Sequence, residues 1–117
     1  MANNVSFNST RINSRSVSYL CTLAAGDTDT AILVVEPDSL VSIFIDVGTS
    51  ETVALEATNK ANVPDDVITS ADMQIIKPAI TSDFDDFFTG PVTAIQVTGT
   101  IAANETLVRV LEVKQPR

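Results

Sequence analysis

The stretch that decides the fold begins at Asp83 and reads Asp83-Phe84-Asp85-Asp86-Phe87-Phe88-Thr89-Gly90. After a proline come two runs rich in β-branched residues, 92–100 and 106–114, joined by a short turn. Because such residues suit the pleated surface of a sheet, both runs are predicted to be strands. We expect them to form a terminal hairpin, and we expect residues 80–88 to form an acidic and aromatic loop that leads into it.

Five earlier segments carry the same kind of signal. In residues 40–47, for example, Val41, Ile43 and Ile45 fall on one face and Phe44 falls on the other, which is the alternation of a half-buried strand. No amphipathic helix separates these segments, so the pattern argues against alternating strands and helices. The sequence therefore predicts an all-β fold, a single antiparallel β-sandwich or jelly-roll-like domain of about seven strands. The five segments are 17–23, 30–36, 40–47, 51–58 and 72–77.

Residues 59–71 form the least regular part of the interior. Pro64 disfavours helical geometry at the residue before it, and one helical turn is expected over residues 65–71. Pro78 follows the run 72–77 and is predicted either to end that strand or to mark it as an edge strand.

Composition excludes most catalytic chemistry. The chain of 117 residues has no histidine and one cysteine, Cys21. The missing histidine excludes a Ser-His-Asp triad and the common histidine-ligated metal sites. A lone cysteine excludes an intramolecular disulfide, and Cys21 is expected to be a small buried hydrophobic residue. We therefore expect a protein that is not an enzyme and that binds no cofactor.

Charge divides the chain into two parts. The net charge is −8, yet residues 1–16 carry Arg11 and Arg15 and no acid. We expect an extended polar N-terminal arm at 1–16, which contacts a partner, and a β-sandwich domain at 17–117. A frayed terminus is the simpler alternative for the arm. An acidic surface repels phosphate, so no nucleic-acid partner is expected.

No stretch approaches the roughly 20 apolar residues that span a bilayer, and the N-terminus lacks the apolar run of a signal peptide. We therefore expect neither a membrane partner nor secretion by that route.

The three aspartates at 83, 85 and 86 allow two interpretations. Calcium binds clusters of carboxylate oxygens, but two phenylalanines interrupt the spacing of a calcium loop. The favoured interpretation is an acidic loop that Phe84, Phe87 and Phe88 anchor to the core or to a neighbouring subunit. Arg109 lies among β-branched residues and is either an exposed face position or, as we favour, paired with an acid such as Glu112 or one on the next strand.

Residues 84–113 resemble a C-terminal module of small tailed-bacteriophage virion proteins. The resemblance rests on the acidic and aromatic stretch at 83–88, on Gly90-Pro91-Val92-Thr93-Ala94-Ile95-Gln96-Val97-Thr98, and on the closing run 106–113. Proteins of this appearance often carry tryptophan in the aromatic stretch and arginine after the Thr-Ala-Ile run. Here those places hold phenylalanine and Gln96.

The resemblance implies a capsid decoration (cement) protein, a homotrimer that binds the major capsid protein on the outside of the virion and is made in the host cytoplasm. A tail or head-fibre module that binds a host surface or a glycan is the alternative. A mean hydropathy of +0.23 with 5 % aromatic residues also indicates apolar surface in excess of one small core. The residues expected to make assembly or partner contacts are Val5, Phe7, Arg11, Ile12, Arg15, Phe84, Phe87 and Phe88.

Overall fold

The computed structural model describes residues 2–24, 28–88, 91–101 and 103–114. Over these residues the protein is nearly all β, with ten strands in two five-stranded sheets. The all-β prediction is confirmed, whereas the expected number of about seven strands is wrong. The three additional strands are β1 (Ala2–Val5), β2 (Asn8–Arg11) and β8 (Phe84–Phe88). The sequence Ala25-Gly26-Asp27 predicts a turn, and these residues lie outside the described ones.

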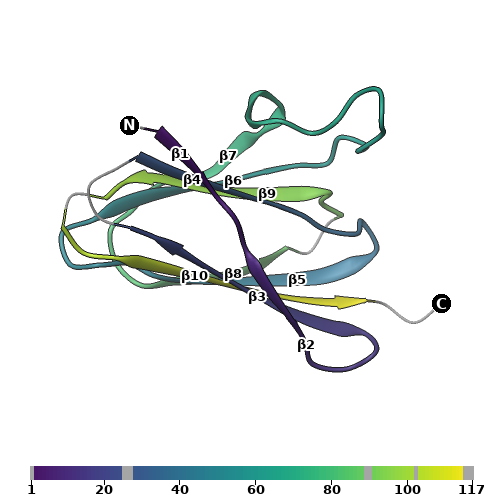
Figure 1. The fold of residues 1–117 in the computed structure, drawn as a ribbon, viewed down its shortest axis with the longest axis horizontal. Coiled ribbons are helices and arrows are strands. Elements are labelled where there is room, and N and C mark those ends of the chain that lie inside the picture. Colours follow the sequence, from purple (N-terminus) through teal and green to yellow (C-terminus); the bar gives the residue numbers. More distant parts are fainter. Residues whose placement is uncertain (1, 25–27, 89–90, 102, 115–117) are drawn as a thin grey trace.

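The two sheets lie one above the other as two layers (Figure 1). Sheet A has the strand order β1-β4-β9-β6-β7, where β4 is Thr28–Val34, β9 is Ala94–Thr100, β6 is Thr52–Thr58 and β7 is Gln74–Ile80. Sheet B has the order β2-β3-β10-β5-β8, where β3 is Ser16–Leu23, β10 is Thr106–Lys114 and β5 is Ser39–Asp46.

The chain changes layer at nearly every connection from β3 to β10. Only β6 and β7 are consecutive strands of one sheet in this part of the chain. The expected terminal hairpin is therefore wrong, because β9 lies between β4 and β6 while β10 lies between β3 and β5. Each of the two strands has an apolar face, and placing them in opposite layers lets both faces cover one core.

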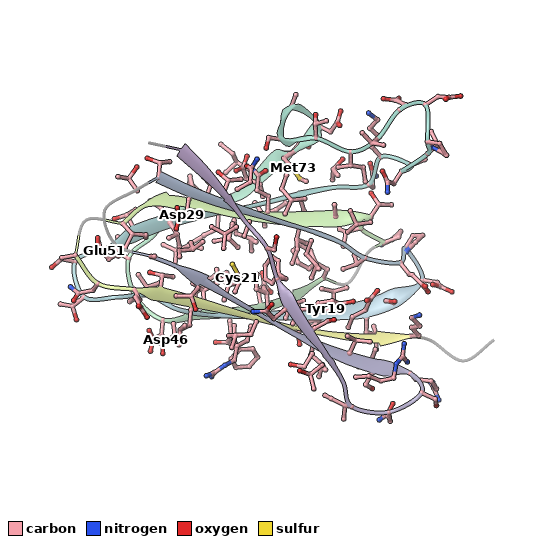
Figure 2. All side chains as sticks on the ribbon, viewed as in Figure 1. Tyr19, Cys21, Asp29, Asp46, Glu51 and Met73 are labelled. Atoms are coloured by element: carbon pink, nitrogen blue, oxygen red, sulfur yellow. The ribbon has the colours of Figure 1, made fainter. Side chains whose placement is uncertain are left out.

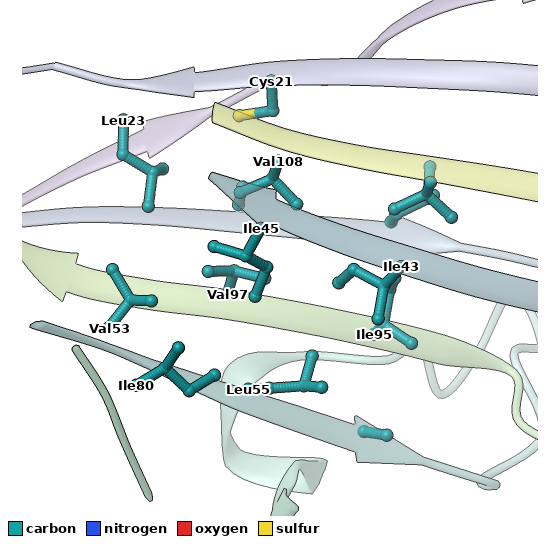
Figure 3. Close-up of a cluster of buried hydrophobic side chains, with 14 of the residues drawn as sticks. Cys21, Leu23, Ile43, Ile45, Val53, Leu55, Ile80, Ile95, Val97 and Val108 are labelled. Atoms are coloured by element: carbon teal, nitrogen blue, oxygen red, sulfur yellow. The ribbon is translucent and has the colours of Figure 1, made fainter. Parts of the chain in front are cut away.

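The core fills the space between the layers (Figure 3). From sheet B, Ile43, Ile45 and Val108 point inward, and from sheet A, Leu55 and Val97 meet them. All five are at most 2 % exposed. Removing a side chain of this size from water contributes roughly 1.5 to 3 kcal/mol, so this shared core is the main stabilising contact of the two sheets.

The first two strands, β1 and β2, lie in different layers. Strand β1 pairs in parallel with β4, and β2 pairs antiparallel with β3, so the segment crosses the side of the molecule from one sheet to the other (Figure 1). Val5 and Phe7 are half-buried against the core. The boundary expected at residue 16 therefore does not separate two bodies, because ladder hydrogen bonds and apolar contacts hold the described part of this segment on the rest of the chain.

The segment expected to be an acidic loop is strand. Strand β7 continues through Pro78 to Ile80, at the edge of sheet A where proline is tolerated. Strand β8 forms the edge of sheet B, paired with β5. The expected helical turn is present as a short 3-10 helix, shifted to Ser70–Asp72.

Candidate assembly surface

The three phenylalanines of β8 divide between the two faces of sheet B. Phe84 lies opposite Ile45 and Phe88 opposite Val41, so both point inward and pack against the core. Phe87 has the other parity and is 65 % exposed. Phe87 therefore does not anchor this segment to the core, because a strand presents alternate residues to opposite faces. Its anchoring to a neighbouring subunit, the alternative, stays a prediction.

The five expected contact residues of the N-terminal segment also differ in their surroundings. Val5 and Phe7 contact the core, whereas Ile12, in the turn after β2, is 58 % exposed. Arg15 binds the end of β10, since its Nε and Nη2 donate to the carbonyl oxygen of Lys114 at 3.2 and 3.1 Å. Arg11 donates to backbone carbonyls of the same turn. The structure thus brings Arg11, Ile12 and Arg15 together at one end of sheet B.

The outer face of sheet B carries most of the exposed apolar residues that lie in strands. Phe44 is 58 % exposed and lies in the strand next to Phe87. Asp46 is on this same outer side, whereas Cys21 lies between the layers (Figure 2). We call this face the outer B face. Its apolar members are Leu20, Leu40, Phe44, Phe87, Leu107, Leu111 and Val113.

The outer face of sheet A has a different chemistry. Threonine hydroxyls pair across β4 and β9, with Thr28 Oγ1 2.8 Å from Thr100 Oγ1 and Thr30 Oγ1 2.9 Å from Thr98 Oγ1. Beside them, Gln96 Nε2 donates to a carboxylate oxygen of the neighbouring strand at 2.8 Å. Polar groups that already satisfy one another offer little free energy to a partner. This face also carries the exposed apolar residues Val34 and Ile75, but β9 and β6 separate their strands. The two outer faces are therefore not equivalent.

Glu112 is the buried carboxylate at one end of the core. It is 3 % exposed, and its oxygens accept hydrogen bonds from Tyr19 Oη at 3.0 Å, from the backbone N–H of Glu36 at 2.8 Å and from Ser39 Oγ at 2.9 Å. Burial, together with the hydrogen bond to this carboxylate, raises the pKa of Tyr19 to about 12. Three donors, one from β3 and two from residues 36–39, make Glu112 a structural clamp.

Other carboxylates hold loops in the same way. Glu51 is buried and accepts the backbone N–H groups of Ala103 and Asn104 at 2.9 and 2.8 Å. Asp83 Oδ1 accepts the N–H of Val47 at 3.2 Å, which fixes the start of β8 against the end of β5. These acids stabilise the connections between layers, because a charged acceptor on a backbone N–H is a strong hydrogen bond.

The calcium interpretation gains no support from the geometry. Asp85 and Asp86 are adjacent in a strand and project to opposite faces of sheet B. Asp86 Oδ1 accepts the backbone N–H of Phe87 at 2.8 Å. Within the part of the chain that the structure describes, no three histidine, cysteine or acidic side chains lie close enough together to hold a metal ion.

Cys21 is buried, as the sequence predicted. Burial, with Asp29 nearby, raises the pKa of its thiol to about 11. The thiolate is the reactive form of cysteine, so this residue serves packing.

Arg109 does not pair with Glu112, one of the two acids expected for it. Residues three apart in a strand lie on opposite faces, and Glu112 points into the core while Arg109 is exposed on the outer B face. Its neighbours across the two adjoining strands are Leu20 and Phe44.

Six apolar residues of this surface were not predicted from the sequence, namely Leu20, Leu40, Phe44, Leu107, Leu111 and Val113. A signal for two of them was present, since Leu40 and Phe44 make the second face of the run 40–47 partly apolar. A strand that is apolar on both faces indicates either a central buried strand or an interface.

Comparison of the sequence with protein-family models gives no match, and comparison with curated proteins and with solved structures gives none. In the described ranges, no helix has the length and the apolar character needed to cross a membrane.

Proposed function

We propose that the protein is a non-enzymatic structural component of a virus particle, a decoration protein that binds the outer shell and stabilises contacts between capsomers. The observation that carries this proposal is the outer B face. A chain with a net charge of −8 exposes five large apolar side chains on one sheet face, and contiguous apolar surface of this kind is typical of interaction sites. The buried carboxylates Glu112 and Glu51 meanwhile accept hydrogen bonds from the protein itself.

The strand order supports this class of protein. Strands β3 to β10 give one sheet in the order β3-β10-β5-β8 and the other in the order β4-β9-β6-β7. We infer from this winding that the domain is a jelly roll, the finer of the two folds that the sequence allowed. Viral capsid domains, lectins and cupins share that architecture. One fold serves many functions, so the jelly roll supports this proposal by analogy alone.

The turn after β2 is our candidate for the contact with the major capsid protein. It brings Arg11, Arg15 and the exposed Ile12 together on a chain that is otherwise strongly acidic. An acidic or polar patch on the shell would complement these residues. Exposed charge contacts are screened over about 8 Å at physiological ionic strength, so binding should weaken as salt increases, and the contact of Ile12 should moderate that effect.

Co-sedimentation with empty shells of the encoding phage tests this contact. We expect the wild-type chain to bind, and we expect Arg11→Glu combined with Ile12→Ser to bind at least about tenfold more weakly, as for other interface centres. Lys77→Glu, on the opposite sheet, is the matched charge control and should bind normally. Equal binding of the wild type and the double variant would contradict a role for this turn, and no binding of the wild type would contradict decoration.

An adhesion module is the second candidate. The observation that favours adhesion is the pair of exposed aromatic rings, Phe44 and Phe87, on neighbouring strands of the outer B face. Aromatic platforms of this kind can stack on sugar rings. Binding of the labelled protein to host cells, competed by soluble host polysaccharide and lost in Phe44→Ser, would support adhesion against decoration.

A further inference from the structure

We propose that the outer B face packs against the same face of a second copy of this chain, around a two-fold axis that runs along β5. The proposal concerns self-association and holds whether or not the protein decorates a shell. It commits to a second copy because the charges and the apolar residues of this face are arranged to complement themselves.

The charges of this face allow two copies to meet there. The whole chain carries −8, so most relative orientations of two copies bring like charges together. The outward-pointing positions of β3, β10, β5 and β8 carry one base, Arg109, and two acids, Asp46 and Asp85. The base offers one of these acids a partner in a second copy, and the exposed apolar side chains of the face supply the attraction.

The register of the strands gives the complementarity. One row across sheet B reads Arg109, Phe44 and Asp85 on β10, β5 and β8, and the next reads Leu111, Ser42 and Phe87. A two-fold axis along β5 exchanges the strands on its two sides. Arg109 of each copy then lies opposite Asp85 of the other, and Leu111 opposite Phe87.

Residues of β5 itself meet their own copies on the axis. Phe44 then faces Phe44, and Leu40 faces Leu40, which gives two aromatic or aliphatic contacts at the centre. The same operation brings Asp46 toward Asp46, and this is the unfavourable pair of the arrangement. Asp46 ends β5, so that repulsion falls at the rim of the face, where water screens it.

Pairing through the edge of sheet B is the competing arrangement, and the sequence opposes it. Strand β8 is the edge of sheet B next to β5, and two β8 strands side by side would gather Asp85 and Asp86 of both copies. Acidic residues on edge strands are a known protection against such pairing. Face-to-face packing instead places Asp85 beside a base.

The size of the face sets the expected affinity. Strands β10, β5 and β8, which the axis brings face to face with their copies, span about 15 Å by about 25 Å at ordinary strand spacing and rise. Since a standard interface takes roughly 800 Å² of accessible surface from each partner, a face of about 400 Å² in plan belongs at the lower end. We expect a dimer that forms in the micromolar range. This differs from the homotrimer that the resemblance implies, and the measured mass decides between them.

Sedimentation equilibrium of the full chain, from low micromolar to submillimolar concentration, is the test. We expect a monomer–dimer equilibrium. Arg109→Asp and Asp85→Arg should each weaken it at least about tenfold, because each creates two like-charge contacts. The double variant Arg109→Asp with Asp85→Arg should regain most of the wild-type affinity. Lys77→Asp, an exposed charge reversal on sheet A, should change nothing.

Circular dichroism melting shows whether each variant is folded, and these exposed positions should tolerate the changes. A monomer at all concentrations, a trimer, or a dimer that both single variants leave intact would each overturn the proposal. Failure of the double variant to recover, with the fold intact, would also overturn it, because reciprocal pairing requires recovery. None of these outcomes depends on whether the chain binds shells.

Discussion

Glu112 ties together three parts of the chain that are distant in sequence. Its carboxylate on β10 receives donors from β3, from the residues before β5 and from the start of β5 itself. A buried carboxylate is tolerated only when such donors satisfy it, because its desolvation is costly. The clamp therefore holds one end of both layers in register.

Replacing Glu112 should strongly destabilise the protein. Glu112→Ala removes the acceptor for Tyr19, Ser39 and the backbone of Glu36 and leaves their donors buried, so we expect a loss of about 2 to 4 kcal/mol in the free energy of unfolding. Urea denaturation measures it. Glu105→Ala, an exposed acid in the loop before β10, is the control and should cost under about 0.5 kcal/mol. Similar losses for both variants would contradict the clamp.

The phenylalanines of β8 should separate stability from association. Phe88→Ala removes a side chain that packs against the core, so it should lower the free energy of unfolding by about 2 kcal/mol. Phe87→Ala removes a side chain that is 65 % exposed and should leave the melting temperature nearly unchanged while it weakens self-association. A large drop in melting temperature for Phe87→Ala at low protein concentration would show that its ring is buried in solution.

Ionisation of Tyr19 should lower the stability of the protein at alkaline pH. Its pKa is raised from 10.0 to about 12 in the folded state, so the fold favours the neutral phenol. That stabilisation is complete below pH 10 and is lost as the pH rises toward 12. The stability difference between wild type and Tyr19→Phe should therefore shrink over that range, measured by urea unfolding at several pH values. A constant difference from pH 9 to 12 would contradict this account.

Strand β8 shows why the alternation of apolar residues did not predict a strand at residues 84–88. In a core-facing strand every second residue is apolar, but here Asp86 occupies an inward position between Phe84 and Phe88. Such a charge is tolerated only because β8 is an edge strand, where an inward acid still reaches water and also prevents edge pairing. A strand with an acid on its inner face looks like a loop in sequence.

The pairing partners of the last two strands could not be predicted from the sequence either. The runs 92–100 and 106–114 were recognised, and β9 and β10 lie within them. A short connection fits a hairpin as well as a crossing between layers, and the alternation of apolar residues is the same in both. Only the contacts of β9 with β4 and β6, and of β10 with β3 and β5, decide the matter. Strand existence is thus encoded locally, whereas sheet order depends on long-range packing.

Strands β1 and β2 should contribute to stability and not only to partner contact. Deleting residues 2–11 removes the half-buried Val5 and Phe7 and uncovers the edges of β3 and β4. We expect a folded protein that has lost about 2 to 4 kcal/mol in its free energy of unfolding. Val5→Ala with Phe7→Ala in the full chain separates packing from strand pairing and should lose about half of that amount. A truncated chain as stable as the wild type would show that these strands are frayed in solution.

For the molecule as a whole, the sequence predicted apolar surface in excess of one core but not where that surface lies, and its role in assembly stays a prediction. The missing histidine and the excess of aliphatic residues pointed to assembly and away from catalysis. The outer B face could not be assembled from sequence, because Phe44, Leu111 and Phe87 become neighbours only through the pairing of β5 with β10 and β8. Of the residues expected at the interface, Phe87 and the turn with Ile12 remain exposed, while Val5, Phe7, Phe84 and Phe88 pack against the core.

If the protein decorates a capsid, as we propose, an electron cryomicroscopy reconstruction of the purified phage particle will show where it binds. We expect density for this two-layered domain on the outside of the shell, between neighbouring capsomers, with the turn that carries Arg11, Ile12 and Arg15 against the major capsid protein. Density for the domain on the tail or on a fibre, or its absence from the particle altogether, would rule out decoration.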